Sequence, residues 1–290
     1  MSARLLEISE ADYFADKILP DTPTLSQSIA SVLIDKSPLH AWAAHPRLGN
    51  CDGSETTKAL DDGTLMHHML LGTGAGAVTI IDAKDYRTKD AQALRDAAIA
   101  AGSLPVLAHK YDELFSGVKT IRQRMADAGV DLALFDAAKS ESAILWQEDG
   151  VWCRGKMDKL HVERRTIFDV KKTRSAKPSD CGKAMMNYGY DIQWAAYTSA
   201  LDELTGSPGD ADMQIIFIED VAPYVVTVGR PDGIMRELGA KKWRQAVAMW
   251  KSCMESGRWP GYAASPVRFE APPWSIAQQM ASEMEDESDE

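Results

Sequence analysis

The feature that most constrains the fold is a change of hydrophobic period near residue 140. Residues 142–160, SAILWQEDGVWCRGKMDKL, contain two short β-type runs that are joined by Glu-Asp-Gly. Asp-Gly between two such runs is a strong signal for a β-hairpin. Residues 164–172, RRTIFDVKK, supply a third β-type run. We therefore expect a sheet built on these three strands at the centre of the fold.

Helical patterns precede these strands, and a helix, two strands and a second helix follow them. The helices expected before the sheet cover residues 24–38, with a Ser cap and a stop at Pro38, and then 61–72, 90–101 and 105–128. After it we expect a helix over 180–205, strands over 213–220 and 224–230, and a helix over 231–257. This order predicts an α/β (α+β) sheet domain behind a helical N-terminal portion.

The chain is expected to form one domain with an acidic tail. The domain covers residues 1–275, with a helical N-terminal portion over about 1–135 and a sheet core over about 136–260. The tail covers 276–290, and its last eight residues, EMEDESDE, hold six acids. The simplest interpretation is a disordered, solubilising end, and a partner-binding or DNA-mimicking segment is the alternative.

Composition limits the class of protein and its compartment. No apolar run approaches the roughly 20 residues that span a bilayer, and the first residues are too acidic for a signal peptide. We therefore expect a soluble, cytoplasmic protein without a membrane partner. Cys51, Cys153, Cys181 and Cys253 are far apart and include no Cys-x-x-Cys pair, which indicates scattered reduced thiols rather than a zinc or iron–sulfur site.

The net charge of −11 argues at first against a polyanionic partner, but the charges are segregated. Residues 162–183 hold seven Lys or Arg against three acids. Within this segment Asp169 and Lys171 lie two apart on one strand, and Asp158 ends the strand before it. Side chains two apart share a face of a strand, and carboxylates on neighbouring strands can meet at one hard divalent cation. A plain surface ion pair is the alternative.

Four stretches, in this order along the chain, resemble the PD-(D/E)xK nuclease superfamily, and within it the RecE-type phage exonucleases of the exodeoxyribonuclease VIII family. They are GTLMHHMLL (63–71), GKMD (155–158), DVKKT (169–173) and YGYDIQWAAYTSAL (188–201). The resemblance implies a restriction-endonuclease-like core, which is a mixed central sheet flanked by helices. It also implies Mg²⁺ as the cofactor, with Mn²⁺ as a substitute.

The resemblance assigns the metal site residue by residue. His67, rather than its neighbour His68, matches the family's ligand; Asp158 and Asp169 match its carboxylate ligands, and the backbone carbonyl of Val170 is a further one. Lys171 would orient or deprotonate the attacking water and offset charge on the phosphate. Glu141 either matches an acid of the corresponding family strand or is a solvated acid at the end of a strand.

The same resemblance suggests DNA contacts. Gln193 and Tyr197 lie four residues apart on one helix face. The resemblance makes them DNA or active-site contacts, and the alternative is that they flank the core. The family strand often has Thr directly after its Lys, whereas here Lys172 intervenes before Thr173. Lys172, Thr173, Arg174 and Lys177, with Lys183 beyond them, are expected to attract the DNA backbone without regard to sequence.

The expected function is that of a Mg²⁺-dependent exonuclease that degrades one strand of linear double-stranded DNA, from 5′ to 3′. The resemblance adds a RecT-like single-strand annealing protein as partner, and a homo-oligomer in the form of a closed ring. Two alternatives are a structure-specific or nicking endonuclease and a non-catalytic DNA-binding module.

Overall fold

The computed structural model describes residues 3–49, 62–72 and 78–288, except for the side chains of 62–64 and 282–288. Its main element is a seven-stranded sheet in the order β1-β5-β6-β7-β8-β9, with β2 beside β6. The strands are β1 (Arg4–Leu6), β2 (Leu25–Ser26), β5 (Lys139–Glu148), β6 (Val151–His161), β7 (Thr166–Thr173), β8 (Asp212–Glu219) and β9 (Val226–Gly229). Pairs β2–β6 and β7–β8 are parallel and the others antiparallel, so the predicted mixed sheet is confirmed.

The predicted hairpin at the centre of the sheet is present. Asp149 and Gly150 connect β5 to β6 with positive φ angles of 48° and 82°. Two-residue loops with left-handed residues match the twist of the flanking strands, and Gly adopts this conformation without strain. The strands on either side pair from Glu148 and Val151 onward, which places β6 at the centre of the meander that the sequence predicts.

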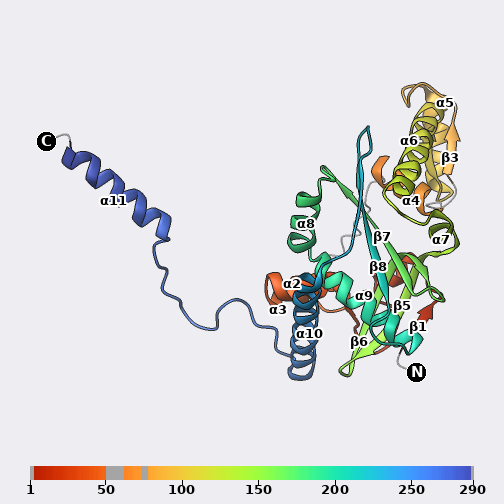
Figure 1. Cartoon of the computed structure of the whole chain (residues 1–290). Helices are drawn as coiled ribbons and strands as arrows, with labels where there is room; N and C mark the ends of the chain where they lie inside the picture. The colour runs from red at the N-terminus through yellow and green to blue at the C-terminus, as the bar shows by residue number, and fades with distance from the viewer. Residues whose placement is uncertain (1–2, 50–61, 73–77, 289–290) are drawn as a thin grey trace.

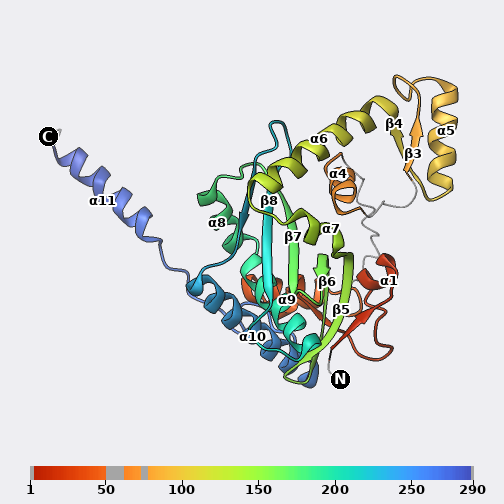
Figure 2. The same cartoon turned by 45° about the vertical axis from the view of Figure 1, so that its right-hand side comes forward.

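Helices cover both faces of the sheet, and each face has its own apolar core (Figures 1 and 2). On one face α2 (Gln27–Asp35), α9 (Tyr190–Thr205) and α10 (Gly233–Ser256) enclose the indole rings of Trp146, Trp243 and Trp250. On the other, α4 (Asp62–Leu71), α6 (Ala108–Asp127) and α7 (Leu132–Ala137) pack around Phe135 and Phe168. The predicted helices 24–38, 61–72 and 231–257 correspond to α2, α4 and α10.

The crossover from β7 to β8 contains two helices, so the prediction of one helix over 180–205 is wrong. The chain forms α8 (Pro178–Asn187) and then α9, with Gly189 between them at φ 67°. A β-carbon on Gly189 would lie 2.5 Å from Ser31 Oγ of α2. Glycine is therefore required at this turn both by the backbone conformation and by the close approach of α2.

The sequence patterns predicted a helical N-terminal portion, but the structure also has strands there. Besides α1 (Glu10–Phe14), α2 and α3 (Pro38–Ala44), it contributes β1 and β2 to the main sheet. A separate two-stranded parallel sheet, β3 (Val78–Ile81) and β4 (Leu104–Leu107), flanks α5 (Lys89–Ala100). Consequently α6 begins at Ala108 and not at residue 105. These strands are too short to show an alternating pattern, and pairing with distant residues stabilises them.

The C-terminal end also differs from the expectation of a disordered tail. Residues 273–288 form α11 (Pro273–Ser288), which stands clear of the rest of the protein in both views (Figures 1 and 2). Pro273 occupies the first helical position, where a missing N–H is no loss, and Ala, Gln, Met and Glu favour the helix that follows.

The described cysteines agree with the prediction of scattered thiols, because Cys153, Cys181 and Cys253 are free and buried. Cys51 lies outside the described residues. Among the helices that the structure describes, none combines the length and the apolar character needed to cross a bilayer.

A buried ion pair fixes the central strand β6 to the N-terminal segment. Arg154 Nη1 of β6 lies 2.8 Å from Asp16 Oδ1, and neither side chain is more than 5% exposed. The second oxygen, Asp16 Oδ2, accepts the N–H of Thr24, and His45 Nε2 lies 3.4 Å from the same Oδ2. Burial alone would raise the pKa of Asp16, but the contacts with His45, Arg154 and Thr24 outweigh it and lower the pKa.

Asp16→Asn should lower the free energy of unfolding by about 3–5 kcal/mol at neutral pH, because it leaves the Arg154 charge buried and unpaired. The folded-state pKa of Asp16 is below its unfolded value, so its stabilisation is present above the unfolded pKa and lost as pH falls through the folded one. Urea unfolding at pH 7 and in acid would test both statements. Asp96→Asn, which removes an exposed ion pair with Arg95, is the matched control and should cost at most about 1 kcal/mol.

Candidate functional site

The candidate site lies where strands β6 and β7 separate. The ladder between them pairs Lys159–His161 with Thr166–Phe168. Beyond this ladder the Asp158 side chain replaces a backbone acceptor, because its Oδ2 accepts the backbone N–H of Val170 at 2.7 Å. A carboxylate therefore satisfies a strand donor that no backbone carbonyl of β6 meets.

The neighbouring pair of strands is also irregular at this level. The register of β5 and β6 pairs Ser140 with Lys159 and Ser142 with Met157, but it skips Glu141 and Asp158, which lie opposite each other. Glu141 has a left-handed φ of 51°, which is unusual for a non-glycine residue. Such conformations are retained where the surrounding structure fixes them, and they are frequent at functional sites. Here the unusual backbone conformation belongs to Glu141, which is itself a candidate metal ligand.

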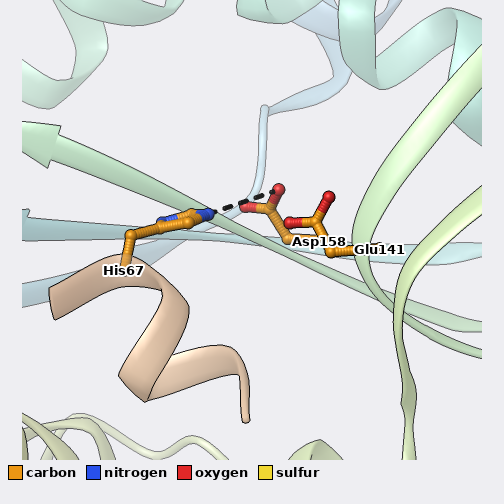
Figure 3. Close-up of side chains that lie close together, drawn as sticks. All are labelled: His67, Glu141 and Asp158. Carbon is orange, nitrogen blue, oxygen red and sulfur yellow. Dashed lines mark ion pairs between the residues drawn. The ribbon is translucent and has the colours of Figure 1, made fainter. Parts of the chain in front are cut away.

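Three ligating side chains meet at this point (Figure 3). His67, Glu141 and Asp158 each offer an atom within 4.8 Å of the others, and His67 Nε2 is 3.9 Å from Asp158 Oδ1. Helix α4 supplies the imidazole, and strands β5 and β6 supply the carboxylates. Carboxylates suit hard cations such as Mg²⁺ or Mn²⁺, and an imidazole suits transition metals. The residues present therefore fit a divalent cation.

Asp169 and Lys171 adopt the arrangement that their spacing predicts. Lys171 Nζ lies 2.7 Å from Asp169 Oδ2, and Gln193 Nε2 donates to the other oxygen, Oδ1, at 2.7 Å. Asp169 is only 1% exposed, and its Oδ2 is buried without a well-directed hydrogen bond. That oxygen retains capacity for a further cation. Asp169 is nevertheless not part of the cluster of possible metal ligands, which consists of His67, Glu141 and Asp158.

Burial and neighbouring charges shift the pKa values of Asp158, His67 and Lys171. Burial, together with the charge of Asp169, raises the pKa of Asp158 to about 8. Burial lowers the pKa of the His67 imidazole, which favours its neutral, ligating form. For Lys171, burial acts to lower the pKa, but the attraction of Asp169 and Asp158 is larger and the pKa is raised. The site therefore disfavours ionised Asp158 unless further positive charge is present.

Two residues of the site were missed by sequence reasoning. Lys156 forms an ion pair with Glu141 and lies 3.2 Å from Glu10. Lys156 lies two residues before Asp158 on the same strand, and this spacing could have indicated that the two side chains share a face. The ring of Tyr190, in the first turn of α9, lies 4.5 Å from Lys171 Nζ, close enough for a cation–π contact. Tyr190 belongs to the stretch YGYDIQWAAYTSAL that resembles the family, and this was the available signal.

The remaining predicted residues divide into exposed and buried ones. Arg174 and Lys177 are exposed, and Lys172 is half-exposed with its Nζ 3.9 Å from Asp220. The Thr173 hydroxyl donates to the Ser175 carbonyl and so stabilises the turn that follows β7. The ligand role of the Val170 carbonyl stays a prediction.

Gln193 and Tyr197 are buried at 4% and 5% exposure, which does not fit a surface DNA contact. Gln193 instead orients Asp169, and the Tyr197 hydroxyl donates to the carbonyl of Lys156 at 3.0 Å. Both side chains therefore position residues of the site from the helix behind it. For Gln193 this is the active-site contact that the sequence analysis offered as an alternative.

His67→Ala should weaken Mn²⁺ binding on the order of 10- to 100-fold, as the loss of a metal-site interaction does, whereas His68→Ala should leave it nearly unchanged. Isothermal titration calorimetry would separate the two variants, and equal affinities would remove His67 from the site. The wild-type affinity should also fall as pH drops below about 8, because a cation must then displace the proton that Asp158 holds at its raised pKa.

Comparisons with known proteins support the fold. A crystal structure of a candidate exonuclease from Eubacterium rectale matches with a TM-score of 0.58 and 13% identity, over 95% of this chain and 99% of that one, which supports the fold. A phage-related exonuclease from Haemophilus somnus shares 14% identity over 68% of this chain and 95% of its own, but its TM-score of 0.31 is too low for a structural argument. No curated protein matches the sequence.

A family model matches residues 30–266, which include every residue of the site described above. Its description, a PDDEXK-like domain, is that of the PD-(D/E)xK nuclease superfamily. The chain therefore belongs to the family of PDDEXK-like domains of unknown function (DUF3799).

Proposed function

We propose that this protein is a Mg²⁺-dependent exodeoxyribonuclease that degrades one strand of linear double-stranded DNA. The observation that carries the proposal is the meeting of Asp158, Asp169 and Lys171 with His67 and Glu141 where β6 and β7 separate. Membership of the PDDEXK-like family supports a nuclease. The exonuclease assignment rests on the RecE-type motifs, and the name of the structural relative agrees with it.

Hydrolysis of a phosphodiester requires a nucleophile near neutral pH and compensation of the negative charge that grows on the phosphate. A bound divalent cation supplies Lewis acidity for both requirements. His67, Glu141 and Asp158 would hold it, and Asp169, whose Oδ2 is paired with Lys171, lies on the neighbouring strand. Asp169 and the Tyr190 ring hold the Lys171 ammonium in place, where it can orient a water molecule and offset charge on the phosphate.

The DNA backbone would approach along the basic segment that follows β7. Lys172, Arg174 and Lys177 lie in or directly after the strand that carries Asp169 and Lys171. Contacts with phosphate oxygens position a duplex without reading its sequence. Arg174 has a planar fork of donors that suits a phosphate, and a terminal 5′-phosphate carries more charge than an internal diester. This supports end recognition by the loop.

Asp169→Asn and Lys171→Ala should each lower the rate of DNA hydrolysis by at least about 100-fold, because the first weakens cation binding and the second removes support for the transition state. Duplex binding should survive in both. The assay is release of label from an end-labelled linear duplex with Mg²⁺, with EDTA as the control. Digestion at a near wild-type rate by either variant would contradict the assignment.

A nicking or structure-specific endonuclease is the closest alternative, because the same site chemistry serves both reactions. Covalently closed circular DNA separates the two, since an exonuclease leaves it intact and an endonuclease opens it. A non-catalytic DNA-binding module is a further alternative, which the joint presence of the two acids, the lysine and the histidine argues against. Failure to cleave any linear duplex with Mg²⁺ would favour that alternative.

We further propose digestion from 5′ ends by a ring-shaped homo-oligomer that supplies a 3′ single strand to a RecT-like annealing protein in the bacterial host cytoplasm. This part rests on the resemblance to exodeoxyribonuclease VIII.

A duplex with a 5′-phosphate at one end and a 5′-hydroxyl at the other, each strand labelled separately, tests polarity and end recognition together. We expect the phosphorylated 5′ end to be degraded faster, and Arg174→Ala to reduce this preference. Release from 3′ ends first would refute the polarity, and equal rates from both 5′ ends would refute the phosphate contact.

A further inference from the structure

An exposed aromatic side chain lies beside the residues proposed to be catalytic. Tyr188 is 69% exposed, and its ring centroid is 5.8 Å from that of Tyr190. Tyr190 in turn lies 6.2 Å from Phe217 of β8 and 4.5 Å from the Lys171 ammonium. Three rings therefore lead from the sheet to the surface, and the outermost is separated from Lys171 by one ring only.

The position of Tyr188 is set by a rigid turn. Tyr188 caps the C-terminal end of α8, and Tyr190 begins α9 after the left-handed Gly189. The backbone of this turn lies against Ser31 of α2, which leaves no room for a β-carbon on Gly189. A large, largely apolar ring is thus held in solvent by a well-defined backbone, which is a suitable arrangement for binding a flat partner.

The acids and the lysine lie deeper than Tyr188. Asp169 is 1% exposed and the Lys171 side chain is 18% exposed. A frayed terminal nucleotide can bring its phosphodiester closer to groups at this depth than a stacked one can, but fraying costs unstacking energy. Aromatic rings on the protein surface recover such energy by stacking on the freed base, regardless of its identity.

We propose that Tyr188 is a stacking platform for the unpaired terminal nucleobase of the strand that is hydrolysed. The inference rests on the proposed function and specifies its substrate as a frayed duplex end. The Tyr188 ring replaces the neighbouring base, while Lys171 and the acids engage the phosphate below. Recognition is independent of sequence, because every base offers a π face.

The test measures binding of a duplex that carries 2-aminopurine as its terminal base, in EDTA so that no cleavage occurs. The fluorescence of this base reports whether it is stacked. Tyr188→Ala should weaken binding by about 5- to 150-fold, the range expected for one base–aromatic stack, and should abolish the change in fluorescence. Tyr188→Phe should behave like the wild type because it retains the ring. Phe269→Ala, which removes a 90% exposed ring elsewhere in the chain, should also behave like the wild type.

A duplex whose terminal nucleotide lacks its base completes the test. Wild type and Tyr188→Ala should bind this abasic duplex equally, because no base remains to stack. An equal loss on both duplexes, or a loss in Tyr188→Phe as large as in Tyr188→Ala, would overturn the inference. Thermal unfolding followed by circular dichroism checks that each variant is folded.

The outcomes also distinguish this inference from the function on which it rests. If the wild-type chain binds and digests linear duplexes but Tyr188→Ala is unchanged on every substrate, only the stacking role of Tyr188 is wrong. If the wild-type chain neither binds duplex ends nor digests them with Mg²⁺, the proposed nuclease function itself is wrong.

Discussion

The hydrogen bond from the Val170 N–H to the Asp158 carboxylate is the interaction on which the site depends. It satisfies a strand donor at the point where β6 and β7 separate, and a side chain is used in place of a backbone carbonyl. Asp158 thereby bridges the two strands, next to Asp169 and Lys171 of β7. The same bond directs one oxygen of Asp158 into the sheet and leaves the other near His67.

Charge balance is the second constraint on the site. Glu141, Asp158 and Asp169 gather on three neighbouring strands, and the lysines closest to them are Lys156 and Lys171. Burial, with the charge of Asp169, keeps the pKa of Asp158 raised despite this compensation. A divalent cation would complete it, so the electrostatics and the donor set lead to the same conclusion. Lys156 ties Glu141 to the N-terminal helix α1 through Glu10.

The surrounding structure holds these groups from several directions. Arg154, two residues before Lys156 on β6, is anchored by buried Asp16, and the Tyr197 hydroxyl binds the backbone of Lys156 itself. Helix α9 contributes Gln193 to Asp169 and begins with Tyr190 against Lys171. The crossover after β7 therefore does more than return the chain to β8. It positions the acid and the lysine, and its turn presents Tyr188 to solvent.

The amino-acid sequence by itself determined the elements whose signals are local. The Asp149-Gly150 turn, the three central strands, the shared face of Asp169 and Lys171 and the basic segment after them follow from short-range patterns, and family motifs added His67 and Gln193 to the candidates. Only the tertiary structure decided that Glu141 and His67 meet at Asp158, that Lys156 pairs with Glu141, that Tyr197 is buried, and that the 180–205 segment breaks at Gly189. These features depend on contacts between residues far apart in the chain, on which local periodicity carries no information.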